Sequence, residues 1–440
     1  MTTIGIRLED KSRWERRVPL VPTDLERLIE ERGLRFLVQS SPNRIFPDQD
    51  FRDVGAEIGD DLSSAGVVFA VKEIPIDLLR ADTTYAFFAH VIKGQRHNMP
   101  LLRRLLDQRC TLIEYERITD VDDRRLVLFG REAGQAGMID SLHFLGKRFA
   151  HEGYGTPLSQ VRMAHEYDDL ADAKEQIVKV GEAIEDQHLA LPDLPLVVAF
   201  TGRGNVAQGA QEIFDLLPFD EAVPEELADI CSRDDDYYRN RVVKVRLQKK
   251  HLVAPEWRGT RFDLTEYREH PERYRGRLAE FLPYITALIT GHFWTDRFPR
   301  FFTKEDAAEL WRRGETKLRL IGDVTCDLDG AIELTQKVTT IDEPAFVYDP
   351  RDGSLHDGYE GEGVVVLSVD NFPCELPRDA SRRFSHALRA FVPAIARADY
   401  DVPFDQLDLP EEVKKAVVTH RGELTPGYRY LQAYLDAAGA

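Results

Sequence analysis

The chain has 440 residues, of which 43% are hydrophobic, enough for two or three domains with sizeable cores. Its 77 acidic and 58 basic residues give a net charge of −19, which argues against general binding to nucleic acid or to an anionic membrane. The four cysteines, Cys110, Cys231, Cys326 and Cys374, show no C-x-x-C spacing, so neither structural zinc nor a disulfide framework is expected. No apolar stretch approaches the roughly 20 residues of a membrane span. The composition predicts a cytoplasmic protein without a metal.

The first 130 residues alternate short strands with helices, which is typical of a parallel α/β sheet. A helix is expected over 23–32, with Thr23 as its N-cap and Gly33 as its stop, and another over 100–107. Strands are expected over 4–7, 35–38, 67–71, 85–89 and 112–115.

Several charged side chains follow these strands. They are Arg17, Lys72, His90, Lys93 and Glu116. The carboxyl ends of parallel strands meet at one edge of a sheet, so these groups would form a pocket for carboxylates. Crowded cations lower the pKa of a lysine or histidine, as proton transfer near neutrality requires. Each residue taken alone is more often a surface charge or a structural histidine, and only their shared position favours a site.

A helix expected over 131–149 would bridge two domains. A second α/β unit then runs to about 375, and it contains an apolar run, 196–201, that leads into Gly202-Arg203-Gly204-Asn205-Val206-Ala207. This strand, glycine turn and helix is the order that a dinucleotide pyrophosphate needs. Gly202 permits the tight turn, Gly204 lets the backbone approach the phosphates, and Ala207 replaces the third glycine. An ordinary strand-to-helix turn is the alternative.

The second unit also contains a charged segment and further strands and helices. Residues 234–261 are charged and are expected to form an irregular excursion, with the basic run 244–251 at the surface. Strands are expected over 318–323 and 363–369, a helix over 381–395, and a helical and irregular tail that returns to the first domain. Ligands of open α/β sheets lie beyond the carboxyl ends of strands. The expected cofactor contacts are Thr201, Gly202, Arg203, Gly204, Asn205, Val206, Asp323 and Asn371.

The motifs together resemble a known family, the lysine–2-oxoglutarate reductase domain of the bifunctional aminoadipic semialdehyde synthases. Fungal saccharopine dehydrogenase (lysine-forming) and alanine dehydrogenase are similar at a greater distance. The resemblance covers about residues 3–395. It is carried by residues 4–7, 14–17, 85–93, 133–139, 200–206, 270–274, 339–341 and 368–373.

The resemblance implies an α/β fold of two Rossmann-like domains with parallel sheets separated by a cleft. Residues 1–140 with 376–440 would form the substrate-binding catalytic domain, and residues 141–375 the dinucleotide-binding domain. It also implies the conversion of saccharopine, water and an oxidised nicotinamide cofactor to lysine, 2-oxoglutarate and the reduced cofactor.

The resemblance assigns roles to particular residues. Lys72 and His90 would share the acid–base work, Arg17 would bind a carboxylate, and Lys93, Glu116 and Asp327 would lie on the substrate side. No counterpart of the second, saccharopine-cleaving domain is recognised, so at most one of the two steps is implied.

Two questions stay open at this point. Glu225 or Glu226 can bind a ribose 2′-hydroxyl, which favours NAD, whereas Arg203 or Arg233 can face a 2′-phosphate. Because the bifunctional family uses NADP, we favour NADP(H) over NAD(H). The alternative functions are another opine-type or amino-acid dehydrogenase and a cofactor-binding sensor without turnover. Oligomeric state and physiological direction do not follow from the sequence.

Overall fold

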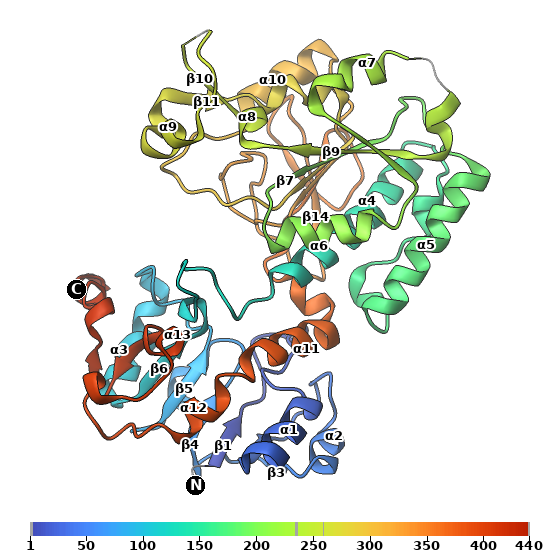
Figure 1. Ribbon diagram of the computed structural model, residues 1–440. Coiled ribbons are helices and arrows are strands. Elements are labelled where there is room, and N and C mark those ends of the chain that lie inside the picture. Colours follow the sequence, from blue (N-terminus) through green and yellow to red (C-terminus); the bar gives the residue numbers. More distant parts are fainter. Residues whose placement is uncertain (1–2, 234–235, 258, 439–440) are drawn as a thin grey trace. The chain divides into compact units, whose positions relative to one another are not determined.

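The structure is a computed structural model that describes residues 3–233, 236–257 and 259–438 (Figure 1). It divides into two compact units, unit 1 (residues 1–129 and 377–440) and unit 2 (residues 130–376). The first boundary falls before residue 130, not at 140, because α4 (Gly130–His151) is one continuous helix that belongs wholly to unit 2. Within the described ranges, no helix is long and apolar enough to cross a membrane.

Unit 1 is built on an eight-stranded sheet with the order β18-β17-β6-β5-β4-β1-β2-β3. Its strands are β1 (Thr3–Ile6), β2 (Arg35–Gln39), β3 (Glu57–Gly59), β4 (Ala65–Phe69), β5 (Thr84–Phe87), β6 (Thr111–Glu114), β17 (Val417–His420) and β18 (Glu423–Leu424). β1 to β6 are parallel and have the doubly wound order 3-2-1-4-5-6. β17 and β18 add an antiparallel edge, so the sheet is mixed where the sequence suggested a parallel one.

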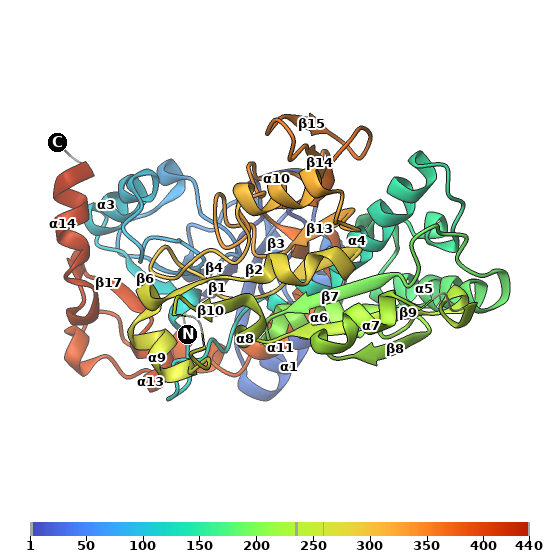
Figure 2. The same ribbon diagram turned by 90° about the horizontal axis from the view of Figure 1, so that it is seen from above.

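The helices of unit 1 cover this sheet, and the C-terminal segment is part of the same body. They are α1 (Pro22–Arg32), α2 (Asp48–Asp53), α3 (Met99–Asp107), α11 (Pro377–Leu388), α12 (Val392–Arg397), α13 (Glu411–Lys414) and α14 (Leu431–Ala438). The hydroxyls of Ser381 and Ser385 on α11 accept hydrogen bonds from the amides of Val18 and Val21 at 3.0 Å. α14 lies beside α3 (Figure 2), where Arg103 donates to the carbonyl of Leu435.

Two helix boundaries differ from those expected. α1 begins at Pro22, with Val21 in place of Thr23 at the N-cap, because proline suits the first helical position. The expected helix over 381–395 is two helices, α11 and α12, and the first of them begins earlier. Gly33 does end α1, with φ +64°.

Unit 2 contains a second eight-stranded sheet, in the order β15-β14-β16-β13-β12-β7-β9-β8, and a small hairpin. The sheet consists of β7 (Val197–Thr201), β8 (Phe219–Ala222), β9 (Val242–Leu247), β12 (Ala287–Thr290), β13 (Leu320–Asp323), β14 (Ala345–Tyr348), β15 (Leu355–Asp357) and β16 (Val364–Leu367). The hairpin pairs β10 (Val253–Pro255) with β11 (Tyr274–Gly276). β14 and β15 are antiparallel and the other six strands of the sheet are parallel, so this sheet too is mixed.

The segment 234–261 is not the irregular surface excursion that its charges suggested. Residues 234, 235 and 258 lie outside the described residues, but the segment includes β9, which pairs with both β7 and β8 inside the sheet. In the basic run 244–251, Lys244 is only 5% exposed and His251 only 4%.

The helices of unit 2 are α4, α5 (Leu170–Gln187), α6 (Asn205–Phe214), α7 (Leu227–Cys231), α8 (Lys249–Leu252), α9 (Leu264–Glu269) and α10 (Lys304–Arg313). α4 and α6 pack side by side (Figure 1). Two glycines allow this close approach. A Cβ on Gly134 would lie 1.9 Å from the carbonyl oxygen of Val206, and one on Gly209 would lie 2.0 Å from that of Arg131.

Candidate functional site

Lys72 lies at the point in unit 1 where the strand order reverses between β1 and β4, the usual ligand position in a doubly wound sheet. Glu9, which follows β1, accepts hydrogen bonds from the amides of Val71 and Lys72 at 2.6 and 3.0 Å. Burial, and then the charges of Arg17 and Lys11, lower the pKa of the Lys72 ammonium below its ordinary value. The lysine is therefore tuned towards proton transfer.

His90 follows the neighbouring strand β5, and its backbone is held in the left-handed region with φ +53°. The amides of Ala89 and His90 both donate to Oε2 of Glu114, at 3.0 and 2.9 Å. Asn98 Nδ2 donates to the His90 carbonyl at 2.8 Å. Because both polar groups of the His90 peptide are engaged, its unusual conformation is maintained by the surrounding structure.

Glu73 joins His90 to Lys11, and its charge also acts on Lys72. Its Oε1 lies 2.5 Å from Nδ1 of His90, and its Oε2 lies 3.1 Å from Nζ of Lys11. Burial opposes ionisation of Glu73, but the hydrogen bond and charge of His90 keep its pKa below the ordinary value. A carboxylate can only accept, so Nδ1 carries the proton and Nε2 is the atom available for catalysis. The His90 side chain is 31% exposed and can meet a substrate.

Arg17 is a buried, paired cation. Its Nε and Nη2 donate to the two carboxylate oxygens of Glu15 at 2.8 and 2.5 Å, and each side chain is 1% exposed. Its guanidinium lies 4.3 Å from the ring centre of Phe129, which contacts Phe88, and Phe88 stacks on His90. Arg17 thus belongs to the same cluster as His90, while its contact with a substrate carboxylate stays a prediction.

Two of the expected site residues stand apart from this cluster. Lys93 is exposed and has no partner among the described residues. Glu116 Oε1 lies 2.8 Å from Nη2 of Arg125. The structure therefore joins Arg17, Lys72 and His90, and it leaves the roles expected for Lys93 and Glu116 as predictions.

In unit 2, the glycine turn lies at the reversal of strand order between β7 and β12. Gly202 has φ +88°, and a Cβ there would lie 2.1 Å from the carbonyl oxygen of Gly291, so only glycine fits. Thr201 is fully buried, and its Oγ1 lies 2.7 Å from Nδ1 of His292. The turn is therefore pinned to the end of β12.

Gly204 is the N-cap of α6, and a Cβ built on it meets nothing within 4 Å. Asn205 and Val206 form the first turn of that helix, where free amides can bind an anion. The space in front of Gly204 is thus open to a phosphate, as the sequence pattern requires.

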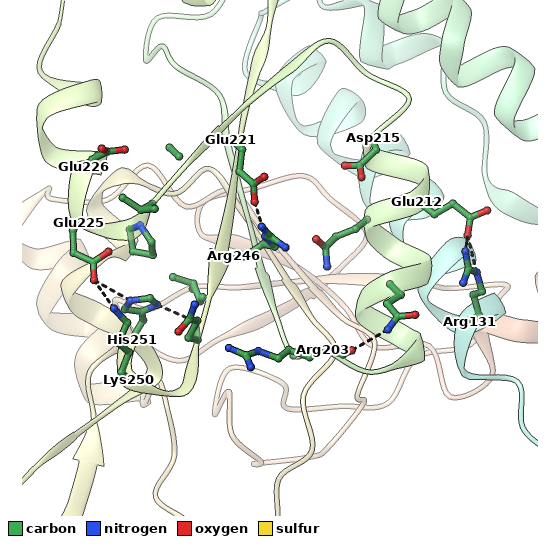
Figure 3. Close-up of a pocket in the computed structure, with 18 residues that line it drawn as sticks. Arg131, Arg203, Glu212, Asp215, Glu221, Glu225, Glu226, Arg246, Lys250 and His251 are labelled. Carbon is green, nitrogen blue, oxygen red and sulfur yellow. Dashed lines mark hydrogen bonds and ion pairs between the residues drawn. The ribbon is translucent and has the colours of Figure 1, made fainter. Parts of the chain in front are cut away.

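A charged cavity of about 830 Å³ lies between this turn, α6 and the ends of β8 and β9 (Figure 3). Most of its cations are paired with acids. The pairs are Arg131 with Glu212 (2.6 Å), Arg246 with Glu221 (2.5 Å), and Lys250 and His251 with Glu225 (3.0 and 3.1 Å). Arg203 is the one basic side chain lining it that has no acidic partner among the described residues, and Figure 3 shows it apart from these pairs.

A second cavity, of about 760 Å³, lies on the other side of the turn and has aromatic walls that include Phe262, Tyr267 and Phe298. Two polar atoms of its lining residues, Nε2 of His292 and the Tyr267 hydroxyl, are buried without a partner among the described residues. Burial, and then the charge of Lys249, lower the pKa of His292 to about 3, so the ring is neutral. Burial lowers the pKa of Lys249, which also lines the cavity, to about 8. Unsatisfied buried groups of this kind fit a ligand that supplies the missing hydrogen bonds.

The remaining expected residues have partners within the protein. The oxygens of Asp323 accept from the hydroxyls of Thr290, Thr325 and Thr335 at 2.5–2.6 Å. Asn371 Nδ2 donates to Sγ of Cys374 at 2.8 Å. Asp327 follows β13 in unit 2 and is half-buried. Contacts of Asp323 and Asn371 with a cofactor, and of Asp327 with a substrate, stay predictions.

Sequence reasoning missed the carboxyls Glu9, Glu73 and Glu114, which hold Lys72 and His90 in place. These three residues could have been identified from the sequence, because each lies at or just after a strand of the sheet. It also missed the second cavity, whose aromatic residues are scattered over 262–298 and show no periodic pattern.

Comparison with known proteins finds a match to both domains of one family. Residues 5–136 match the family "Alanine dehydrogenase/PNT, N-terminal domain", and residues 319–427 match "Alanine dehydrogenase/PNT, C-terminal domain". The chain is similar to an L-alanine dehydrogenase of known structure, with a TM-score of 0.60, 18% identity, and coverage of 99% of this chain and 100% of that one. This likeness supports the two-sheet α/β fold.

Two curated relatives are similar in sequence. The alpha-aminoadipic semialdehyde synthase of Arabidopsis thaliana is 37% identical over 97% of this chain and 41% of its own length. The saccharopine dehydrogenase [NAD(+), L-lysine-forming] of Emericella nidulans is 24% identical over 88% of this chain and 90% of its own length. The chain thus spans less than half of the first relative. Because both domains of one family match and these relatives are similar over most of the chain, the chain is related to the alanine dehydrogenase/PNT family and is a homologue of the alpha-aminoadipic semialdehyde synthases and saccharopine dehydrogenases.

Proposed function

We propose that this chain is a nicotinamide-dependent oxidoreductase that acts on a CH–NH bond and interconverts saccharopine with lysine and 2-oxoglutarate. In the cleaving direction, hydride leaves the substrate for the cofactor, water adds to the resulting imine, and the carbon–nitrogen bond breaks. The names of the two relatives support this reaction. Unit 1 supplies the acid–base groups, and unit 2 supplies the cofactor site.

The arrangement of Lys72, Glu73 and His90 carries the proposal. Addition of water to an imine and loss of the amine each need a proton to move near neutral pH. Lys72 has a lowered pKa, and Nδ1 of His90 is engaged by the Glu73 carboxylate, which leaves Nε2 for the substrate. A protein that only senses a cofactor has no need for such a pair.

We further propose NADP(H) as the cofactor. Of the two acids that could hold a ribose 2′-hydroxyl, Glu225 and Glu226, the first already contacts Lys250 and His251. Arg203 lines both cavities beside the glycine turn and has no acidic partner among the described residues, so it can pair with a 2′-phosphate. The aromatic cavity, with its unsatisfied His292 and Tyr267 atoms, suits the adenine ring.

The reaction is tested by following the absorbance of reduced cofactor with lysine and 2-oxoglutarate. Lys72→Met and His90→Gln should each slow turnover by about 10²–10⁴-fold, and the double variant should lose less than the product of the single losses. Lys304→Met and His356→Gln, which change the same residue types on unit 2, are the matched controls. Near-normal turnover in both site variants would refute the assignment.

The cofactor preference is tested with Arg203→Ala. Loss of a charge-assisted phosphate contact should weaken NADPH binding about tenfold or more and leave NADH binding almost unchanged. Arg246→Ala is the control, since Arg246 is already paired with Glu221. Equal loss for the two cofactors in Arg203→Ala would contradict a 2′-phosphate contact.

A further inference from the structure

A third cavity, of about 500 Å³, lies wholly within unit 1 and has a lining of uniform charge. Its described lining residues include three basic side chains and no acidic one. They are Ile92, Arg117, Phe404, Lys414, Lys415, Thr425, Gly427, Tyr428 and Tyr430. In a chain of net charge −19, such a cavity is an exception that needs a chemical reason.

The three cations are poorly compensated by the protein itself. Lys415 Nζ donates to the backbone carbonyl of Asp120 at 2.7 Å, and Lys414 Nζ donates to that of Asp405 at 3.0 Å. A carbonyl satisfies a donor but does not neutralise its charge. Arg117 has an acidic partner in Asp123, but the distance is 3.5 Å and the Asp123 side chain is 68% exposed, so that pair is weak.

The walls between these cations are aromatic and well ordered by hydrogen bonds. The Tyr428 hydroxyl donates to the carbonyl of Lys415 at 2.8 Å, and that of Tyr430 donates to the carbonyl of Ile92 at 2.6 Å. Burial raises the pKa of Tyr428 to about 12, so its phenol stays neutral and does not offset the cations. Phe404 lies under the Lys414 ammonium. The site therefore combines positive charge with flat apolar surface.

The cavity lies at the same edge of the sheet as Lys72 and His90 but is made of different residues. β17 is antiparallel to β6, so the residues that precede β17 lie where β6 ends, beside Arg117. None of the residues that join Lys72 to His90 lines it.

We propose that this cavity is a separate binding site for a small organic polyanion that carries carboxylate or phosphate groups. Two lysines and an arginine would pair with its charged groups, and the aromatic walls would cover its carbon skeleton. This assignment rests on the cavity alone and stands whether or not the proposed reaction is correct.

The test is calorimetric titration of the full chain at low ionic strength with citrate as the carboxylate probe, pyrophosphate as the phosphate probe, and glycerol as the uncharged control. Saturable binding of either anion and none of glycerol is expected, and the preferred anion identifies the charged group. Lys414→Gln/Lys415→Gln should weaken binding about tenfold for each lysine. The control pair Lys179→Gln/Lys304→Gln, which removes the same charge from unit 2, should bind normally.

Two further variants keep the result unambiguous. Arg117→Gln changes one residue on a different segment and should also weaken binding, which covers the case of a misfolded double variant. Lys72→Met should bind the anions as the unaltered chain does. The proposal is overturned if neither anion binds, if the two lysine pairs lose affinity equally, or if Lys72→Met abolishes binding, since the anion would then occupy the proposed active site.

Discussion

Glu114 offers a direct measurement of how the His90 loop is held. Its Oε2 accepts the amides of Ala89 and His90, and its Oε1 accepts the amide of Glu116 at 3.2 Å. In Glu114→Gln, the amide oxygen keeps the first two hydrogen bonds, whereas the NH₂ group faces the Glu116 amide and loses the third. A buried donor left unpaired costs about 1–3 kcal/mol.

The pH dependence of this change has a definite sign. Burial, and then the charge of Glu116, raise the pKa of Glu114 from 4.5 to about 8 in the folded protein. Between these values the unfolded chain has released the proton and the folded chain retains it, so unfolding releases a proton and stability falls as pH rises. The slope is about 1.4 kcal/mol per pH unit. Glutamine does not titrate, so the stability advantage of the unaltered chain over Glu114→Gln should shrink by that slope.

The assay is urea unfolding of both proteins at several pH values from about 5 to 8. The advantage of the unaltered chain at the acid end should fall by about 4 kcal/mol across the range, enough to reverse the order of stability. Glu226→Gln, at an exposed position, is the control for the loss of one carboxyl group. A difference for Glu114→Gln that is independent of pH, or that grows with pH, would refute a buried, protonated Glu114.

Three other outcomes follow from the geometry. Gly204→Val should leave the fold intact, because no protein atom lies beside Gly204, and it should abolish binding of reduced cofactor in a fluorescence titration. Unchanged cofactor affinity would contradict a phosphate position beside Gly204. Gly202→Ala should lower the melting temperature, because φ is +88° and the Cβ would lie 2.1 Å from a carbonyl oxygen; an unchanged melting temperature would contradict this. Arg17→Ala should cost about 3–5 kcal/mol in urea unfolding, since it removes one partner of a buried ion pair and leaves the Glu15 carboxylate without that charge. Arg109→Ala, which breaks an exposed pair, should cost at most about 1 kcal/mol, and similar losses for both would rule out a special role for the buried pair.

The strands could be predicted from the sequence where they are apolar, but the prediction failed for a strand that carries charged residues. In β9, Val243, Val245 and Leu247 alternate towards the core with Lys244 between them. The Lys244 ammonium lies 2.5 Å from Asp215 of the loop after α6. Lys244 can be buried because it pairs with an acid from a distant part of the sequence, and local sequence does not show this pair. The basic run 244–251 was therefore predicted to lie at the surface.

The candidate site shows the same division. Position at the ends of strands located Lys72 and His90 at one edge of the sheet. The position of a residue does not show that Arg17 is already paired with Glu15, or that three threonine hydroxyls donate hydrogen bonds to the carboxylate of Asp323. Whether a strand-end charge is free for a ligand depends on neighbours that come from other strands, and local spacing does not contain them.

The close contact between α4 and α6 means that the glycine turn is not a self-contained module. The end of α6 proposed to bind a phosphate is placed by a neighbour about 70 residues earlier in the chain, through Gly134 and Gly209. A graft of residues 197–214 into another scaffold would carry the turn but not its support. Engineering of cofactor choice in this chain should therefore leave both glycines untouched, because changes on α4 that only alter its packing against α6 would also alter cofactor affinity.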